Sequence, residues 1–77
     1  MGAKYPVLRP AEIIKALEKS GFVYKSQRGS HVKYVNTDKG KSTKTVIIPM
    51  HHEVARGTLR SILEQAGLSL DNFLKYL

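Results

Sequence analysis

The feature that most constrains this 77-residue chain is a set of three strand-like segments enclosed by helix-like ones. Residues 22–27, 31–35 and 43–49 alternate between apolar and polar side chains or are rich in β-branched ones, and polar stretches containing glycine separate them. A sheet this small needs cover on its apolar face to be stable in water. The flanking segments are the only part of the chain that can supply this cover, because a chain of this length builds a single small core.

Helical spacing of apolar residues is found on both sides of the three strands. Residues 9–22 predict a helix with Pro10 in its first turn and Gly21 at its end, and the apolar side chains form one stripe. Residues 58–67 predict a second helix with the same spacing, and Ser69 is expected to cap a short last helix. Both long helices bury their stripes if they lie on one face of the sheet, which leaves the other face open.

The predicted fold class is therefore α+β, with a three-stranded antiparallel sheet, two helices packed on one face and a short C-terminal helix. This α-β-β-β-α order is that of double-stranded-RNA-binding domains. We expect a single domain over residues 1–77, with a loose N-terminal segment over 1–8 and a core over about 9–70. A fold order of this kind serves many functions, so the activity has to be argued from particular side chains.

Positive charge is concentrated in the middle of the chain. The formal net charge is +7. Residues 22–45 hold six lysines and arginines against one aspartate, whereas residues 51–77 hold three basic and three acidic residues. A polyanion such as RNA or DNA, or an acidic protein partner, is the natural counterpart of such a segment.

Several classes of protein are disfavoured by the composition. The chain has no cysteine, which removes disulfides, thiol nucleophiles and thiolate metal sites. It has no apolar run long enough to span a bilayer and no signal-peptide pattern, so we expect a cytoplasmic protein without a membrane partner. Its carboxylates are scattered, so two-metal nuclease chemistry is not expected, and neither a metal nor a cofactor is predicted.

The stretch RGSHVKY, residues 28–34, is the best candidate for a reactive site. His31 follows a Gly-Ser turn and shares its predicted strand face with Lys33, and Arg28 is nearby. Gly29 either makes the turn or allows a ligand to approach the backbone closely. An imidazole can take or give a proton near neutral pH, and cations can stabilise charge on a phosphate. RNA suits this set, because its 2′-hydroxyl lies next to its own phosphodiester; the alternative is an ordinary surface histidine.

A second proton-transfer group is needed, since one imidazole cannot easily act as base and acid in the same step. Water, His51, Lys33 and Tyr34 are the candidates for this role. The pair His51-His52 is a poor metal site, because adjacent residues of an extended segment point to opposite sides and zinc needs a third protein ligand.

Four elements, in order over about residues 9–70, resemble the HicA family of small mRNA-degrading toxins. They are the leading helix ending in Gly-Phe, the Q-x-G-S-H-x-x-Y element, the P-x-H after the third strand, and RGTLRSILEQAGLS. The resemblance implies a double-stranded-RNA-binding-domain-like fold, ribosome-independent cleavage of mRNA, and neutralisation by a HicB antitoxin that covers the active site. It places the family's catalytic histidine on His31 and a second recurrent histidine on His51.

The sequence thus predicts the toxin of a toxin–antitoxin pair, a metal-independent endoribonuclease with mRNA as substrate and a HicB-like antitoxin as partner. His31 is the predicted general acid/base, and His51 is a candidate for assisting it. The predicted RNA-binding residues are Arg28, Gly29, Ser30, Lys33, Lys25, Lys44 and Arg56, with further contacts possible at Lys39 and Lys41. A non-catalytic RNA-binding module and a pure protein-interaction subunit are the alternatives, and no oligomeric state is predicted.

Overall fold

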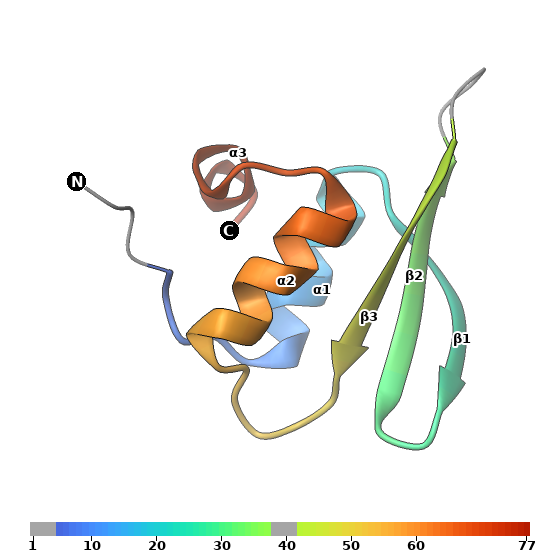
Figure 1. Ribbon diagram of the computed structural model, residues 1–77, viewed down its shortest axis with the longest axis horizontal. Helices are drawn as coiled ribbons and strands as arrows, with labels where there is room; N and C mark the ends of the chain where they lie inside the picture. The colour runs from blue at the N-terminus through green and yellow to red at the C-terminus, as the bar shows by residue number, and fades with distance from the viewer. Residues whose placement is uncertain (1–4, 38–41) are drawn as a thin grey trace.

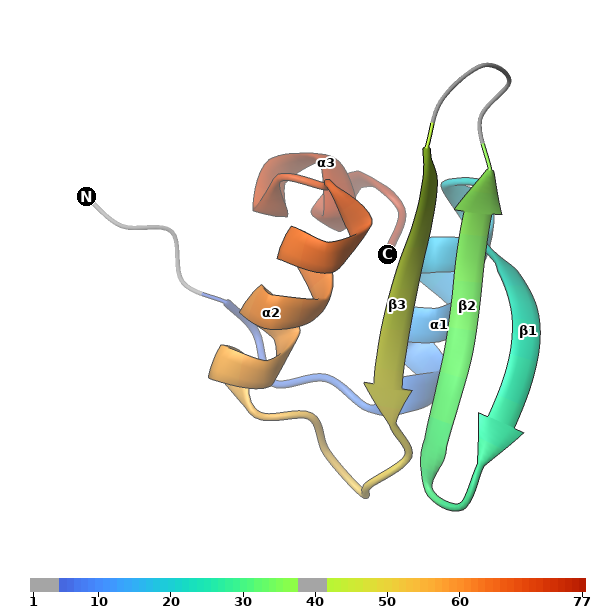
Figure 2. The ribbon, with the colours of Figure 1, turned by 45° about the vertical axis from the view of Figure 1, so that its right-hand side comes forward.

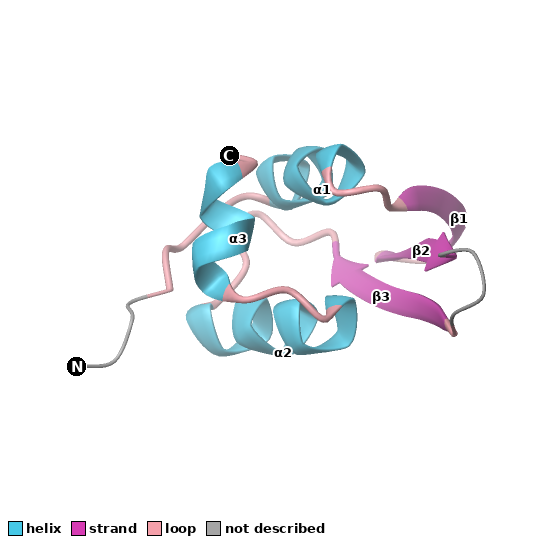
Figure 3. Ribbon diagram, turned by 90° about the horizontal axis from the view of Figure 1, so that it is seen from above, coloured by secondary structure: helices cyan, strands magenta, loops and turns pink. Residues whose placement is uncertain are grey.

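A computed structural model describes residues 5–37 and 42–77, and it has the predicted α+β architecture (Figure 1). Three antiparallel strands form one sheet in the order β1-β2-β3, and the helices lie to one side of it (Figures 2 and 3). The elements are α1 (Pro10–Lys19), β1 (Val23–Arg28), β2 (His31–Thr37), β3 (Thr43–Pro49), α2 (Arg56–Ala66) and α3 (Leu70–Lys75). Within the described ranges, none of the helices has the length and apolar character needed to cross a membrane.

Local chemistry accounts for the ends of α1. Pro10 is its first residue, where the missing N–H group costs no hydrogen bond. At its other end, the N–H groups of Gly21 and Phe22 donate to the carbonyls of Glu18 and Leu17 at 3.1 and 3.0 Å. These two bonds satisfy carbonyls that the helix leaves unpaired, and they turn Phe22 back onto the last turn. The helix is shorter than the predicted 9–22, because Ser20 is its C-cap and Gly21 follows with a φ of +107°, which ends the helical backbone as expected of this glycine.

Some element bounds differ from the predicted ones. α2 begins at Arg56 rather than at residue 58, because the Leu59 N–H already donates to the Ala55 carbonyl at 2.9 Å. β2 runs to Thr37 rather than to residue 35, because pairing with β3 continues to Thr43. The two threonine hydroxyl oxygens lie 3.1 Å apart at this end of the hairpin.

The core lies between the helices and one face of the sheet. β2 and β3 contribute alternate residues to it, whereas every residue of β1 is exposed. Phe22, which was expected to begin the first strand, instead precedes it and is buried in the core. The buried apolar residues are Ile13, Ala16, Leu17, Phe22, Val32, Tyr34, Val46, Ile48, Val54, Leu59, Ile62, Leu63, Ala66, Leu70 and Phe73.

The N-terminal segment is less loose than expected in its described part. Leu8 forms an isolated antiparallel bridge with Val54, whose N–H donates to the Leu8 carbonyl at 2.8 Å. Leu8 and Tyr5 also pack against the core. Residues 5–8 therefore belong to the folded unit, and the reason is a contact between residues more than forty positions apart, which local patterns do not reveal.

The two edges of the sheet differ. The side chain of Gln65 on α2 accepts a hydrogen bond from the Ile47 N–H at 3.1 Å, which covers part of the free edge of β3. At the opposite edge of the sheet, β1 is the outermost strand and pairs only with β2 among the described strands (Figures 1 and 2).

Candidate active site

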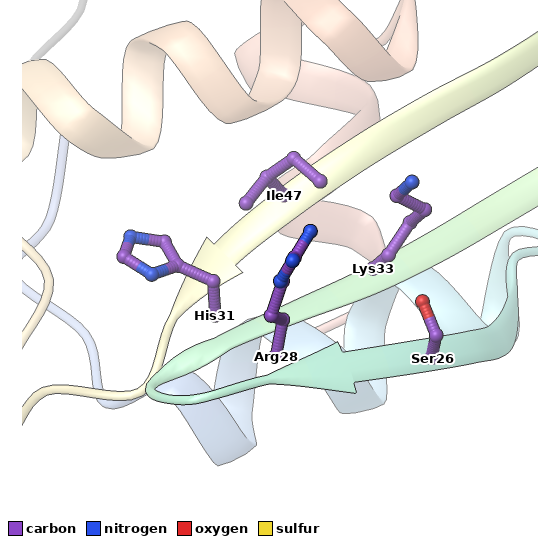
Figure 4. A pocket seen from close by; sticks show the side chains of 5 residues that line it. All are labelled: Ser26, Arg28, His31, Lys33 and Ile47. Carbon is purple, nitrogen blue, oxygen red and sulfur yellow. The ribbon is translucent and has the colours of Figure 1, made fainter.

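The alternation of side chains along β2 separates a covered face from an open one. Val32 and Tyr34 are buried under the helices, with 4% and 6% of their surface exposed. Because successive side chains of a strand point to opposite faces, His31 and Lys33 lie on the face away from the helices. Figure 4 shows both side chains on the same side of the sheet, with α1 behind it. The prediction that these two residues share one face of the strand is confirmed, and this face is the one that the helices leave uncovered.

A two-residue turn aligns β1 with this face. Arg28 pairs with His31 across the turn Gly29-Ser30, so both side chains project from the open face. Gly29 has a φ of +59°, and Ser30 does not share the positive φ, which matches a type II′ turn with glycine in its first central position. A methyl group at Gly29 would meet no described atom within 4 Å, so the backbone conformation rather than crowding requires glycine here.

A β-bulge interrupts β1 further along. Tyr24 pairs with Tyr34, but Ser26 pairs with Lys33, so Lys25 has no partner in the ladder. The bulge turns the Tyr24 side chain toward the side of Tyr34, and the two ring centroids lie 6.0 Å apart, edge to face. Without the extra residue, Tyr24 would pair with Val35 and project from the open face.

The open face carries a pocket of about 270 Å³. Its cationic side chains, Arg28 and Lys33, lie on one side of the His31 ring, and Arg28 lies between the other two (Figure 4). The lining residues are Ser26, Arg28, His31, Lys33 and Ile47. The arrangement can hold an anion such as a phosphate next to an imidazole.

Another hollow of similar volume lies between α1 and the C-terminal residues. It is lined by Glu12, Lys15, Tyr76 and Leu77. Its two charged side chains have opposite sign, and it has no histidine to transfer a proton at neutral pH. The pocket on the sheet is therefore the better candidate for chemistry.

His51 is also close to the pocket. Pro49 pairs with His31 at the end of β3, and the Met50 N–H donates to the Ser30 carbonyl at 2.6 Å, which ties the following loop to the turn. The centroids of the His31 and His51 rings lie 6.5 Å apart, with 70° between the ring planes. Over the residues that the structure describes, three or more His, Cys, Asp or Glu side chains never gather closely enough to hold a metal ion.

Tyr34 is not available to the pocket. It faces the helices, and its hydroxyl donates a hydrogen bond to Glu18 Oε2 at 3.3 Å. Burial raises the pKa of the Tyr34 phenol above its usual value, and the negative charge and hydrogen bond of Glu18 raise it further. Of the candidates for a second proton-transfer group, Tyr34 is therefore excluded by its position.

Five of the seven predicted RNA-binding residues do not line the pocket: Gly29 and Ser30 form the turn beside it, and Lys25, Lys44 and Arg56 lie elsewhere. Lys25 occupies the bulge of β1. Lys44 lies at the opposite end of β3 from Pro49, roughly 17 Å of strand away at about 3.4 Å per residue. The Lys44 Nζ lies 2.7 Å from the position that a Cβ atom would take at Gly67. The ammonium group is therefore beside the C-terminal end of α2. Arg56 uses its Nε to donate to the Tyr5 carbonyl at 2.8 Å. Lys39 and Lys41 lie outside the described residues.

Sequence reasoning missed two residues of the pocket, Ser26 and Ile47. They are the cross-strand partners of Lys33 on the two neighbouring strands. Strand register could have found them, because the two-residue turn fixes the pairing of β1 with β2. The register of β3 with β2 is not fixed in this way, because more than two residues separate Thr37 from Thr43.

The comparison with protein families gives one match. The family model for the HicA toxin of bacterial toxin–antitoxin systems matches residues 10–68, which is most of the chain. No curated protein matches the chain. The matched range includes both long helices, the sheet and the pocket.

Proposed function

Since the chain belongs to the HicA toxin family of bacterial toxin–antitoxin systems, we propose that it is an endoribonuclease that cleaves mRNA without a metal ion and without the ribosome. The observation that carries this proposal is the pocket on the open face of the sheet, where the imidazole of His31 lies beside Arg28 and Lys33.

Each group of the pocket has a role that follows from its chemistry. His31 transfers a proton at the ribose-phosphate junction, since an imidazole can act as base or acid near neutral pH. Arg28 and Lys33 bind the phosphate and stabilise the charge that develops on it as the 2′-oxygen attacks. The Gly29-Ser30 turn leaves space for the RNA backbone, because no described atom lies within 4 Å of where a Gly29 side chain would begin. Lys25, Lys44 and Arg56 are not needed for this step.

A non-catalytic RNA-binding module of the same fold is less well supported. Such a module uses cations at the start of its second helix to reach phosphates. Here the Arg56 guanidinium already donates to the Tyr5 carbonyl, and Arg60 forms an ion pair with Glu64 at 3.6 Å. His31 lines the same pocket as Arg28 and Lys33, and a proton-transfer group among phosphate-binding cations is needed for cleavage but not for binding alone.

A toxin of this family has an antitoxin as partner. We propose that the partner is HicB-like and that it neutralises the toxin by covering the pocket. Acidic groups of the antitoxin then face Arg28 and Lys33, because complementary charge favours this docking and competes directly with RNA phosphates.

Cleavage of a labelled single-stranded RNA in the presence of EDTA tests the proposal. We expect the wild-type protein and His52→Ala to cut the RNA, and His31→Ala to be inactive while it keeps the melting temperature of the wild type. His52 is a matched control, because it is also an exposed histidine but does not line the pocket. Cleavage by His31→Ala at the wild-type rate would refute the catalytic role. Tight RNA binding by the wild type with no cleavage products would instead favour the binding module.

A further inference from the structure

The structure places a second imidazole at the edge of the pocket. The His51 and His31 rings are 6.5 Å apart between centroids and are inclined by 70°. This separation is too large for a direct hydrogen bond between the rings, and it leaves space for a small group that contacts both. A phosphodiester at this position would have one ring near each of the two oxygens that exchange protons.

This arrangement is held by backbone contacts on both sides of His51. Pro49 pairs with His31, and the Met50 N–H donates to the Ser30 carbonyl at 2.6 Å. On the other side, Val54 is buried and bridged to Leu8. The loop is thus anchored at both ends, so the position of His51 relative to His31 follows from the sheet register rather than from a contact between the two rings.

The position also separates His51 from the other candidates for the second proton transfer. The hydroxyl of Tyr34 is on the covered face, where it donates to Glu18. Lys33 is on the open face, but its ammonium group is better suited to bind the phosphate, because a cation there stabilises the charge that develops on the phosphate. His51 has both a side chain that can transfer a proton near neutral pH and a position close to His31.

We propose that His31 and His51 divide the two proton transfers of RNA cleavage, one as general base and the other as general acid; this inference rests on the proposed ribonuclease function. The base takes the proton of the 2′-hydroxyl, and the 2′-oxygen forms a bond to phosphorus. The bond from phosphorus to the 5′-oxygen breaks, and the acid gives its proton to that oxygen. The products are a 2′,3′-cyclic phosphate and a 5′-hydroxyl, with no oxidant or metal required.

The pH dependence of the cleavage rate distinguishes a catalytic role of His51 from a merely structural one. Loss of a structural residue would lower the rate without changing the shape of the pH profile. A base and an acid acting together give a bell-shaped profile. The charged and titratable groups on the surrounding elements are Arg28 and Lys33 on the strands, and His52 and Glu53 on the loop. His52 is the other histidine of this loop and does not line the pocket, so it serves as the control.

The first experiment compares His51→Ala with His52→Ala. We expect His51→Ala to lower the cleavage rate by about 10²- to 10⁴-fold, the usual contribution of a general acid or base, and to lose one limb of the profile. His52→Ala is expected to keep the rate and both limbs. Both residues are exposed, so neither change should alter the melting temperature by much. A bell-shaped profile in His51→Ala would overturn the inference, whatever the rate.

The second experiment uses an RNA with sulfur in place of the 5′-bridging oxygen, a leaving group that needs no general acid. We expect this substrate to restore cleavage to one of His31→Ala and His51→Ala and not to the other, which also assigns the two roles. Restoration in neither variant would overturn the division of labour. If the wild type does not cleave RNA at all, the proposed function fails. If the wild type cleaves and His51→Ala keeps both limbs, only this inference fails.

Discussion

Replacing Lys33 by glutamine tests whether the pocket, rather than the net charge of the protein, recognises RNA. Lys33 lines the pocket, whereas Lys44 lies beside Gly67 at the far end of the sheet. Either substitution, Lys33→Gln or Lys44→Gln, lowers the formal net charge from +7 to +6. The two variants therefore differ in the position of the lost charge and not in its amount.

The expected magnitude follows from the number of phosphate contacts. For a single-stranded nucleic acid, each phosphate contact that the protein loses reduces the steepness of log K against log salt concentration by about 0.7. One lost contact at 0.1 M salt thus lowers the affinity by about fivefold, since 10 raised to the power 0.7 is about 5. We expect this effect for Lys33→Gln and no change of slope for Lys44→Gln.

Fluorescence anisotropy with a labelled single-stranded RNA at salt concentrations between about 50 and 200 mM measures the slope. Both substitutions are made in the His31→Ala background, so that the RNA stays intact during the titration. Equal slopes for the two lysine variants would refute the reasoning, because RNA would then respond to overall charge and not to the open face of the sheet.

Three further predictions concern the fold that positions the site. Gly29→Ala should destabilise the protein by about 1 kcal/mol, because φ is +59° at this position. Gly57→Ala should stabilise it by about 0.5 kcal/mol, because Gly57 lies in α2 and has open space for a methyl group. If the melting temperature shifts in the same direction in both variants, the assigned turn is wrong. The raised pKa of Tyr34 means that the folded state binds the phenol proton more tightly than the unfolded chain, so its contribution to stability is complete below about pH 10 and is lost as pH rises through the higher folded pKa. Urea unfolding at about pH 8 and 11 should show a smaller alkaline loss of stability in Tyr34→Phe than in the wild type, and an equal loss would show that this residue does not contribute. Ile48→Ala should cost about 2 to 5 kcal/mol, because the side chain is fully buried, and Ile47→Ala, on the open face, should cost clearly less in the same urea titration; equal costs would mean that the two faces are wrongly assigned.

Much of the fold follows from patterns that are local in the chain. Pro10 and Gly21 predict the ends of α1, because they act on the hydrogen bonds of their own helix turn. The alternation in HVKYV predicts that His31 and Lys33 share one face of β2, because that alternation is a property of any extended backbone. These features depend on neighbours within about four residues, so the amino-acid sequence is enough to predict them.

Other features depend on contacts between distant parts of the chain. The bulge at Lys25 decides which face Tyr24 joins, and no local pattern distinguished it from the alternation of a regular strand. Lys44 belongs to the basic central segment, yet the register of β3 places it beside the end of α2. Charge content alone could not separate it from Lys33.

The candidate site shows the same division. The proposed role of His31 and the cations beside it can be inferred from residues 28–34, since the turn and the strand bring these residues together within a few positions. The nearness of His51 cannot, because it depends on the pairing of β2 with β3 and on the bond from the Met50 N–H to the Ser30 carbonyl, which joins residues twenty positions apart. Backbone pairing over such distances depends on the packing of the whole core, so only the tertiary structure determines it.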